Sequence, residues 1–157
     1  MEIYFQLISD GASLQKACDE LNNEPYLGFD VETTDLDPYK GDLRLVQLSD
    51  GQNTKVIDLR AFAGDSWGKR ENHPVGETPT PLLRKEGSLR TNPDLAPLRE
   101  LLSSNKQVKI AHNAKFDTKW VRHHLGCEVG NVYDTYLASL LVSAGDGDRR
   151  HGLADVV

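Results

Sequence analysis

The stretch YLGFDVETTDLD, residues 26–37, decides the fold. If residues 26–32 form an extended strand, successive side chains point to opposite faces, so Asp30 and Glu32 share one face. The other face then carries Leu27, Phe29 and Val31. At about 3.3 Å of rise per residue, the two acids lie about 7 Å apart along the backbone, a spacing from which carboxylates can converge on shared cations. Carboxylates beside an apolar core are unfavourable unless a proton or a cation neutralises them, so the stretch predicts a bound metal or a proton at this place.

Two other interpretations of this stretch need weighing. The acids could simply face water on a surface strand, although acidic residues are depleted in strands and four acids within eight residues repel one another. A calcium-binding EF-hand loop that began at Asp35 would need glycine and glutamate where the chain has Lys40 and Val46. The spacing excludes the EF-hand, and the surface strand stays open.

Length and composition indicate one domain. The chain has 157 residues, of which 38% are hydrophobic and 27% charged, which suits a single core. Its net charge of −6 argues against binding nucleic acid through bulk positive charge, so contact with a polyanion must be local or mediated by metal ions. The N-terminus lacks a basic segment, and no apolar run approaches membrane-spanning length, so we expect a soluble protein without membrane contact. Cys18 and Cys127 are too few for a disulfide framework, which favours reduced thiols and a cytoplasmic location.

The first half of the chain predicts strands around one helix. Residues 3–8 alternate like a strand, and Ser13–Leu21 form a short amphipathic helix. After the acidic strand, residues 43–49 and 54–59 form a hairpin across a turn at Asp50 and Gly51. The acidic strand and this hairpin together predict a three-stranded antiparallel meander.

Residues 61–93 break the pattern. The segment is rich in proline and glycine and has no sustained periodicity. Loops of this length inside a compact domain are usually functional or disordered, and we expect a disordered insertion. The alternative is a basic flap that uses Arg84, Lys85 and Arg90 to touch a nucleic-acid backbone.

Alternating helices and strands follow the insertion. Their order is a helix at 94–102, a strand at 108–111, a helix at 114–125, a strand at 132–133 and a buried helix at 135–145. We expect Asn113 to cap the second of these helices and Gly126 to end it. Asp117 falls in the first turn of that helix, where the helix dipole alone would favour an acid. Asp134 is expected to be a helix cap.

The segment HGLADVV, residues 151–157, predicts the first two turns of one more helix. Because apolar Val156 and Val157 stand at the end of the chain, we expect the domain to be C-terminally incomplete, with a further segment or a fused domain following it.

Two motifs carry a family resemblance. FDVETTDLD and HNAKFD, residues 29–37 and 112–117, resemble the first two motifs of the DEDD superfamily of 3′-5′ exonucleases, to which ribonuclease D and the proofreading domain of DNA polymerase I belong. YDTYLASLLVSAG and HGLADVV resemble the segments between the second and third motifs. The resemblance implies an α/β, ribonuclease H-like fold with a mixed sheet, in which the antiparallel meander is followed by alternating helices and strands.

The resemblance also implies a site and a substrate. The acids that match the family's motifs are Asp30, Glu32 and Asp117, and the resemblance implies that they bind two Mg²⁺ or Mn²⁺ ions. With these ions the domain would hydrolyse phosphodiester bonds at the 3′ end of single-stranded DNA or RNA. The implied nucleotide contacts are Thr33 and Asn113, a wedge formed by Leu36, and backbone contacts from Lys115 and Lys119. A solvated helix face would explain the two lysines equally well.

One departure from the family pattern affects activity. The third motif supplies a fourth carboxylate, and Asp146, Asp148 and Asp155 lie too early to match it. We therefore expect weak or absent catalysis from these residues alone. The alternative function is a non-catalytic nucleic-acid-binding or interaction module derived from a nuclease fold.

A zinc site is a third possibility, formed by His123, His124 and Cys127. It is disfavoured because a second ligand pair at zinc-finger spacing is missing and adjacent histidines on a helix diverge.

Overall fold

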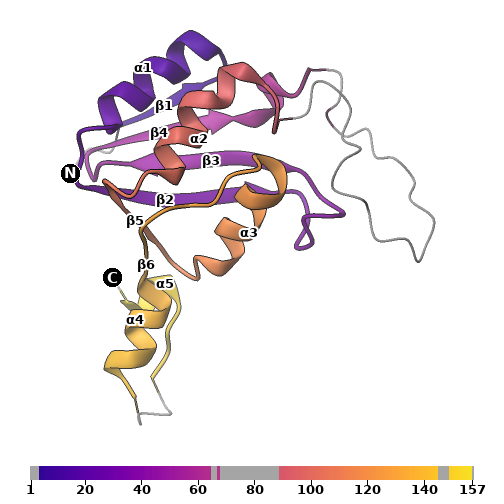
Figure 1. The fold of residues 1–157 in the computed structure, drawn as a ribbon. Coiled ribbons are helices and arrows are strands. Elements are labelled where there is room, and N and C mark those ends of the chain that lie inside the picture. Colours follow the sequence, from indigo (N-terminus) through magenta and orange to yellow (C-terminus); the bar gives the residue numbers. More distant parts are fainter. Residues whose placement is uncertain (1–3, 65–66, 68–88, 145–148, 157) are drawn as a thin grey trace.

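Six strands form one mixed sheet in the computed structural model, which describes residues 4–64, 67, 89–144 and 149–156. The strands are β1 (Tyr4–Ile8), β2 (Tyr26–Thr33), β3 (Leu43–Ser49), β4 (Asn53–Asp58), β5 (Val108–Ala111) and β6 (Val132–Asp134). They lie in the order β1–β4–β3–β2–β5–β6 (Figure 1). β2, β3 and β4 pair antiparallel, whereas β1, β5 and β6 join the sheet as parallel strands. The predicted fold class and meander are confirmed.

The helices occupy three places around the sheet. α1 (Gly11–Leu21) and α2 (Ala96–Ser103) pack together beside the strands of the meander, and α3 (Lys115–His124) lies against β2 and β3 (Figure 1). α4 (Thr135–Val142) and α5 (Leu153–Val156) extend away from the sheet beyond β6. Short 3-10 turns, η1 (Leu59–Phe62) and η3 (Pro93–Leu95), flank the predicted insertion. None of the helices in the described ranges is long and apolar enough to cross a membrane.

The core follows the predicted periodicity. The apolar side chains of β2 are buried, and so are the four that give α1 its apolar face. Burying each large aliphatic side chain contributes about 1.5–3 kcal/mol, so this alternation holds β2 with its apolar residues inward. Cys18 is a free thiol within the core, where burial raises its pKa to about 12, and Cys127 is also free.

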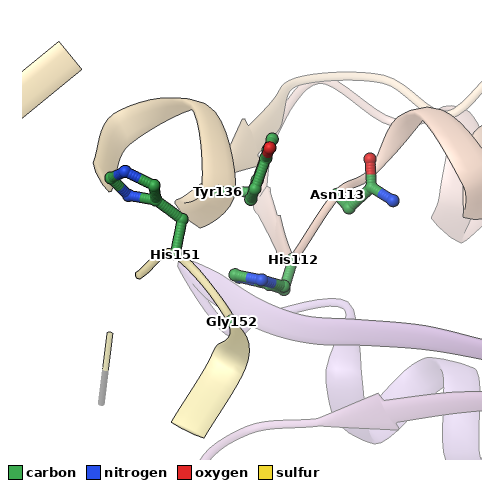
Figure 2. A pocket seen from close by; sticks show the side chains of 5 residues that line it. All are labelled: His112, Asn113, Tyr136, His151 and Gly152. Carbon is green, nitrogen blue, oxygen red and sulfur yellow. The ribbon is translucent and has the colours of Figure 1, made fainter. Parts of the chain in front are cut away.

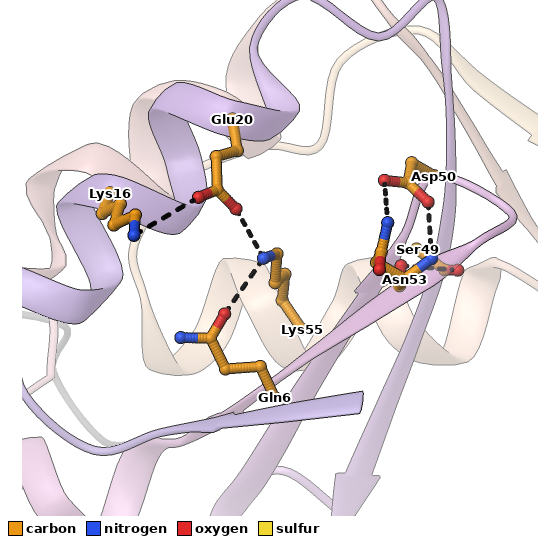
Figure 3. Close-up of polar contacts among 7 residues, drawn as sticks. All are labelled: Gln6, Lys16, Glu20, Ser49, Asp50, Asn53 and Lys55. Carbon is orange, nitrogen blue, oxygen red and sulfur yellow. Dashed lines mark hydrogen bonds and ion pairs between the residues drawn. The ribbon is translucent and has the colours of Figure 1, made fainter. Parts of the chain in front are cut away.

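Polar contacts tie β1, β4 and α1 together (Figure 3). The Lys55 Nζ donates to Gln6 Oε1 at 3.0 Å and to Glu20 Oε2 at 2.6 Å. Lys55 lowers the pKa of the Glu20 carboxyl, which favours the ionised form of Glu20. In the turn between β3 and β4, Asp50 accepts the backbone amide of Asn53 at 2.7 Å. These contacts fix the far edge of the meander.

The ends of the predicted insertion at 61–93 belong to the folded core. Among the described residues of this segment, Phe62, Ala63 and Leu89 are buried. Arg90, one of the three residues proposed for a basic flap, instead donates from Nη2 to the carbonyl of Arg122 at 3.2 Å. Residues 68–88, including Arg84 and Lys85, lie outside the described residues.

The prediction that the helix following Asp134 is buried is wrong. In α4, Leu141 and Val142 are 78% and 79% exposed, and Ser139 is the buried residue of the helix. The physical reason is position, because α4 stands away from the sheet and from α1, α2 and α3 (Figure 1).

Candidate active site

β2 brings Asp30 and Glu32 to its exposed face, as the alternation predicts. The residues between and before them are buried on the opposite face. The Asp30 Oδ2 accepts a hydrogen bond from Gln47 Nε2 at 3.1 Å, across the antiparallel pair that joins β2 to β3. The strand therefore presents two acids, of which Asp30 is held by a neighbour.

Asp117 comes to the same strand from α3. It is only 3% exposed, and its Oδ1 accepts the backbone amide of Val31 at 3.1 Å. β5 pairs with β2 only over Tyr26–Gly28, so beyond Gly28 the edge of β2 needs another acceptor for its amides. The Asp117 carboxylate takes that place, which sets it beside Asp30. A surface acid serving only the helix dipole would not be buried in this way.

Both carboxyls have raised pKa values, and the charge of Asp30 contributes to the shift of Asp117. Burial, and second the negative charge of Asp30, raise the pKa of Asp117 to about 6, and burial also raises the pKa of Asp30. Raised pKa values show that both groups resist ionisation where they lie. A proton or a bound cation would relieve this cost, and a buried carboxyl needing a positive charge suits a metal site.

The third acid is less closely engaged. Within the residues that the structure describes, no three His, Cys, Asp or Glu side chains are grouped closely enough to hold a metal ion. Asp30 and Asp117 are brought together, while the exposed Glu32 shares the face of Asp30 without closing a cage. The donor set consists of carboxylate oxygens, which Mg²⁺ and Mn²⁺ prefer, so these residues fit a hard divalent cation.

The last residue of β2 and the loop after it carry two of the predicted nucleotide contacts. The Thr33 hydroxyl donates to the carbonyl of Asp35 at 2.8 Å, and Leu36 in the loop is 80% exposed. Lys119, predicted to hold a nucleic-acid backbone, donates from Nζ to the carbonyl of Leu36 at 3.2 Å. Lys119 therefore binds the loop to α3, a role that the sequence did not indicate.

Asn113 does not cap α3, contrary to prediction. It has φ of 60°, in the left-handed region that asparagine tolerates better than most residues, and Ala114 occupies the cap position. The physical reason is that Asp134 supplies the acceptor from outside the helix. Asp134 also caps α4, as predicted. Lys115 is exposed at the first position of α3.

The proposed zinc ligands take part in aromatic contacts instead. The His124 ring stacks on Trp120 with centroids 5.1 Å apart, and the His123 ring meets Tyr39 edge-on at 4.5 Å. Cys127 is half-buried against the core.

A pocket that the sequence did not predict lies beside Asn113 (Figure 2). It measures about 430 Å³, and its lining consists of His112, Asn113, Tyr136, His151 and Gly152. The Thr135 hydroxyl donates to the carbonyl of Ala111 at 3.2 Å, and His112 Nδ1 forms a hydrogen bond with the same hydroxyl at 3.0 Å. Each segment in the second half of the chain that carries the family resemblance contributes to this lining. That shared resemblance is the sequence signal from which the pocket could have been predicted.

Comparisons with known proteins identify the family of the chain. A family model described as a 3′-5′ exonuclease matches residues 5–157. DNA polymerase I of Aquifex aeolicus is 32% identical over 98% of this chain and 19% of its own length. Ribonuclease D of Zymomonas mobilis is 23% identical over 89% of this chain and 29% of its own length. The chain thus spans less than a third of each of these relatives.

Solved structures share the fold. Escherichia coli RNase D superimposes with a TM-score of 0.65 at 22% identity, over 98% of this chain and 32% of that one. Brucella melitensis NrnC with bound Mg²⁺ has a TM-score of 0.60 at 25% identity, over 98% of this chain and 58% of that one. The family match spans nearly the whole chain, including both acidic motifs. This chain belongs to the 3′-5′ exonuclease family.

Proposed function

We propose that the domain removes nucleotides from the 3′ end of single-stranded nucleic acid with the help of two divalent metal ions. The observation that carries the proposal is the hydrogen bond from the Val31 amide to Asp117, which brings the acid of the second motif beside Asp30 of the first. These acids come from positions 30 and 117, so their meeting is a property of the fold.

The proposed metal ligands are Asp30, Glu32 and Asp117. The similar NrnC structure contains Mg²⁺, which supports a divalent ion here. When bound, two such ions supply a hydroxide nucleophile and stabilise the leaving 3′-oxygen. The chain's own part is to hold the carboxylates. Val31 and Gln47 orient them by donating hydrogen bonds to Asp117 and Asp30.

The proposed nucleotide contacts come from the segments that carry these acids. Leu36 is exposed and apolar, which suits a wedge against the terminal base, and Thr33 and Asn113 offer polar groups. Lys115 projects from the start of α3 and would meet a phosphate, whereas Lys119 acts through the loop that carries Leu36. The relatives include a DNA polymerase and ribonucleases, and a Trypanosoma brucei RNase D structure holds RNA, so both DNA and RNA are substrates to test.

We expect residues 1–157 on their own to cut slowly. The fourth carboxylate that the resemblance implies has no match among them, which leaves the attacking water without its orienting group. The proposal therefore concerns the type of reaction, and the rate at which residues 1–157 alone catalyse it is expected to be low.

A single-turnover experiment tests the proposal. Excess protein is incubated with Mn²⁺ and a 5′-labelled single-stranded oligonucleotide, either DNA or RNA, and products are resolved by length. We expect slow shortening from the 3′ end, abolished by Asp30→Ala and retained by Asp19→Ala, which removes an exposed acid of α1. Shortening that needs no cation, or that Asp30→Ala leaves intact, would contradict the proposal. Fast multiple turnover would overturn the expectation of weak activity, and binding without any shortening would favour the non-catalytic module.

A further inference from the structure

Asp134 contacts the backbone of two helices at once. At the start of α4, its Oδ1 accepts the amides of Tyr136 at 2.9 Å and Leu137 at 3.4 Å. It also reaches the turn between β5 and α3, where Oδ1 accepts the amide of Asn113 at 3.0 Å and Oδ2 that of Ala114 at 2.9 Å. One carboxylate thus serves four backbone amides at the ends of two neighbouring parallel strands.

α3 depends on this outside acceptor. Ala114 occupies its N-cap position and, as an alanine, has no polar side chain to accept the first amides of the helix. Asn113, just before it, has φ of 60°, a conformation that needs support from its surroundings. The amides at a helix N-terminus are unsatisfied and carry partial positive charge, so a carboxylate there stabilises the helix start.

The start of α3 lies one helical turn from the acids. Asp117 follows Ala114 by three residues, and its Oδ1 accepts the Val31 amide at 3.1 Å, beside Asp30. Because a helix moves as a stiff unit, a shift of its first residues would carry the Asp117 carboxylate along the edge of β2. The bonds made by Asp134 therefore set the position of a proposed metal ligand, Asp117, on which its negative charge also acts.

We propose that Asp134 is a positioning residue for the active site, which fixes the start of α3 and thereby the place where the Asp117 carboxylate meets β2. The metal-binding consequence rests on the proposed function, whereas the placement of Asp117 does not. Asp134 lies at the end of β6, so its role follows from the parallel pairing of β5 with β6.

Two variants separate this role from ordinary capping. Asp134→Asn and Asp134→Ser each keep one oxygen that can accept the amides of α4, because asparagine and serine are good N-caps. Both lose the second carboxylate oxygen, which accepts the amide of Ala114. The matched control is Asp10→Asn, which alters the N-cap of α1, where Asp10 accepts the amide of Ser13 at 2.9 Å.

The first measurement follows the Val31 amide by NMR, through its proton shift and its hydrogen-exchange rate. We expect both Asp134 variants to shift this amide upfield and to speed its exchange about tenfold or more, because its bond to Asp117 weakens. Asp10→Asn should leave it unchanged even if it lowers the melting temperature equally. An unchanged Val31 amide in a folded Asp134 variant would overturn the inference. So would the same change in Asp10→Asn, or failure of both Asp134 variants to fold, since Asp134 would then act on folding alone.

The second measurement is the affinity for Mn²⁺ by calorimetry. Residues that orient metal ligands typically change affinity about tenfold to a hundredfold when replaced, and we expect a loss in that range for both Asp134 variants. Wild-type affinity in these variants would remove the metal-binding consequence. If the wild-type chain itself binds no Mn²⁺, the proposed function fails, while the Val31 amide still decides the role of Asp134.

Discussion

At the scale of single residues, the protonation of Asp117 links stability to pH. Burial and the nearby charge of Asp30 raise its pKa from 3.8 to about 6. A carboxyl with a higher pKa in the folded state binds more protons when folded. Its contribution to stability is therefore full below pH 3.8 and is lost as pH rises through about 6.

Asp117→Asn should remove this pH dependence. Asparagine keeps an oxygen for the Val31 amide but cannot ionise, so the cation-free variant should be more stable than wild type at pH 7.5 by about 1–2 kcal/mol, after allowance for solvent screening. Urea unfolding in EDTA at pH 4, 6 and 7.5 measures the effect. Parallel stability curves for the two proteins would show that Asp117 ionises freely in the fold.

Leu36 offers a second test at this scale. Its side chain is 80% exposed, so Leu36→Ala should leave stability unchanged while weakening oligonucleotide binding about threefold to tenfold, the equivalent of about 1 kcal/mol. Fluorescence anisotropy with a labelled single strand and Ca²⁺ measures the affinity. Leu141→Ala is the matched control, because Leu141 is 78% exposed on α4. Equal affinities for the two variants would remove Leu36 from the binding site.

At the scale of elements, the loop after β2 is packed closely onto α3. A Cβ added at Gly41 would lie 2.6 Å from the Asp35 Cβ and 2.9 Å from Trp120 Cη2. Gly41→Ala should therefore push the loop away and cost about 1–3 kcal/mol of unfolding free energy. Gly28→Ala is the control in β2, because its added Cβ would come no nearer than 3.6 Å to Ser49. Chemical denaturation compares them, and equal stabilities would mean that the loop yields without cost.

The elements also show what the sequence can predict. Alternating side chains predicted β2 and its inward face, and helical spacing predicted the buried residues of α1, because both patterns depend only on local geometry. Asn113 was misassigned since asparagine suits both a cap and a left-handed residue. The reach of Asp134 to Ala114 depends on which strands are neighbours, and local sequence does not carry that information. The exposure of α4 has the same origin, because an apolar helix does not specify what covers it.

At the scale of the whole molecule, bound cations would reconcile an acidic chain with the proposed polyanionic substrate. A net charge of −6 repels nucleic acid, and the proposed cations would lie between the carboxylates and the phosphate. The sheet makes this possible by ending β5 early, so that α3 brings Asp117 to the open edge of β2. The fold, the charge balance and the site then all depend on the contact between Asp117 and the edge of β2.

Calorimetric titration of Mn²⁺ tests most directly whether Asp30 and Asp117 together bind a divalent cation. We predict that the wild-type chain binds Mn²⁺, that Asp30→Asn and Asp117→Asn each weaken binding about tenfold or more, and that Asp19→Asn, on the exposed surface of α1, does not. The two site variants are isosteric, so a loss would reflect charge rather than shape. Equal Mn²⁺ binding by all four proteins, or none by the wild type, would contradict the account.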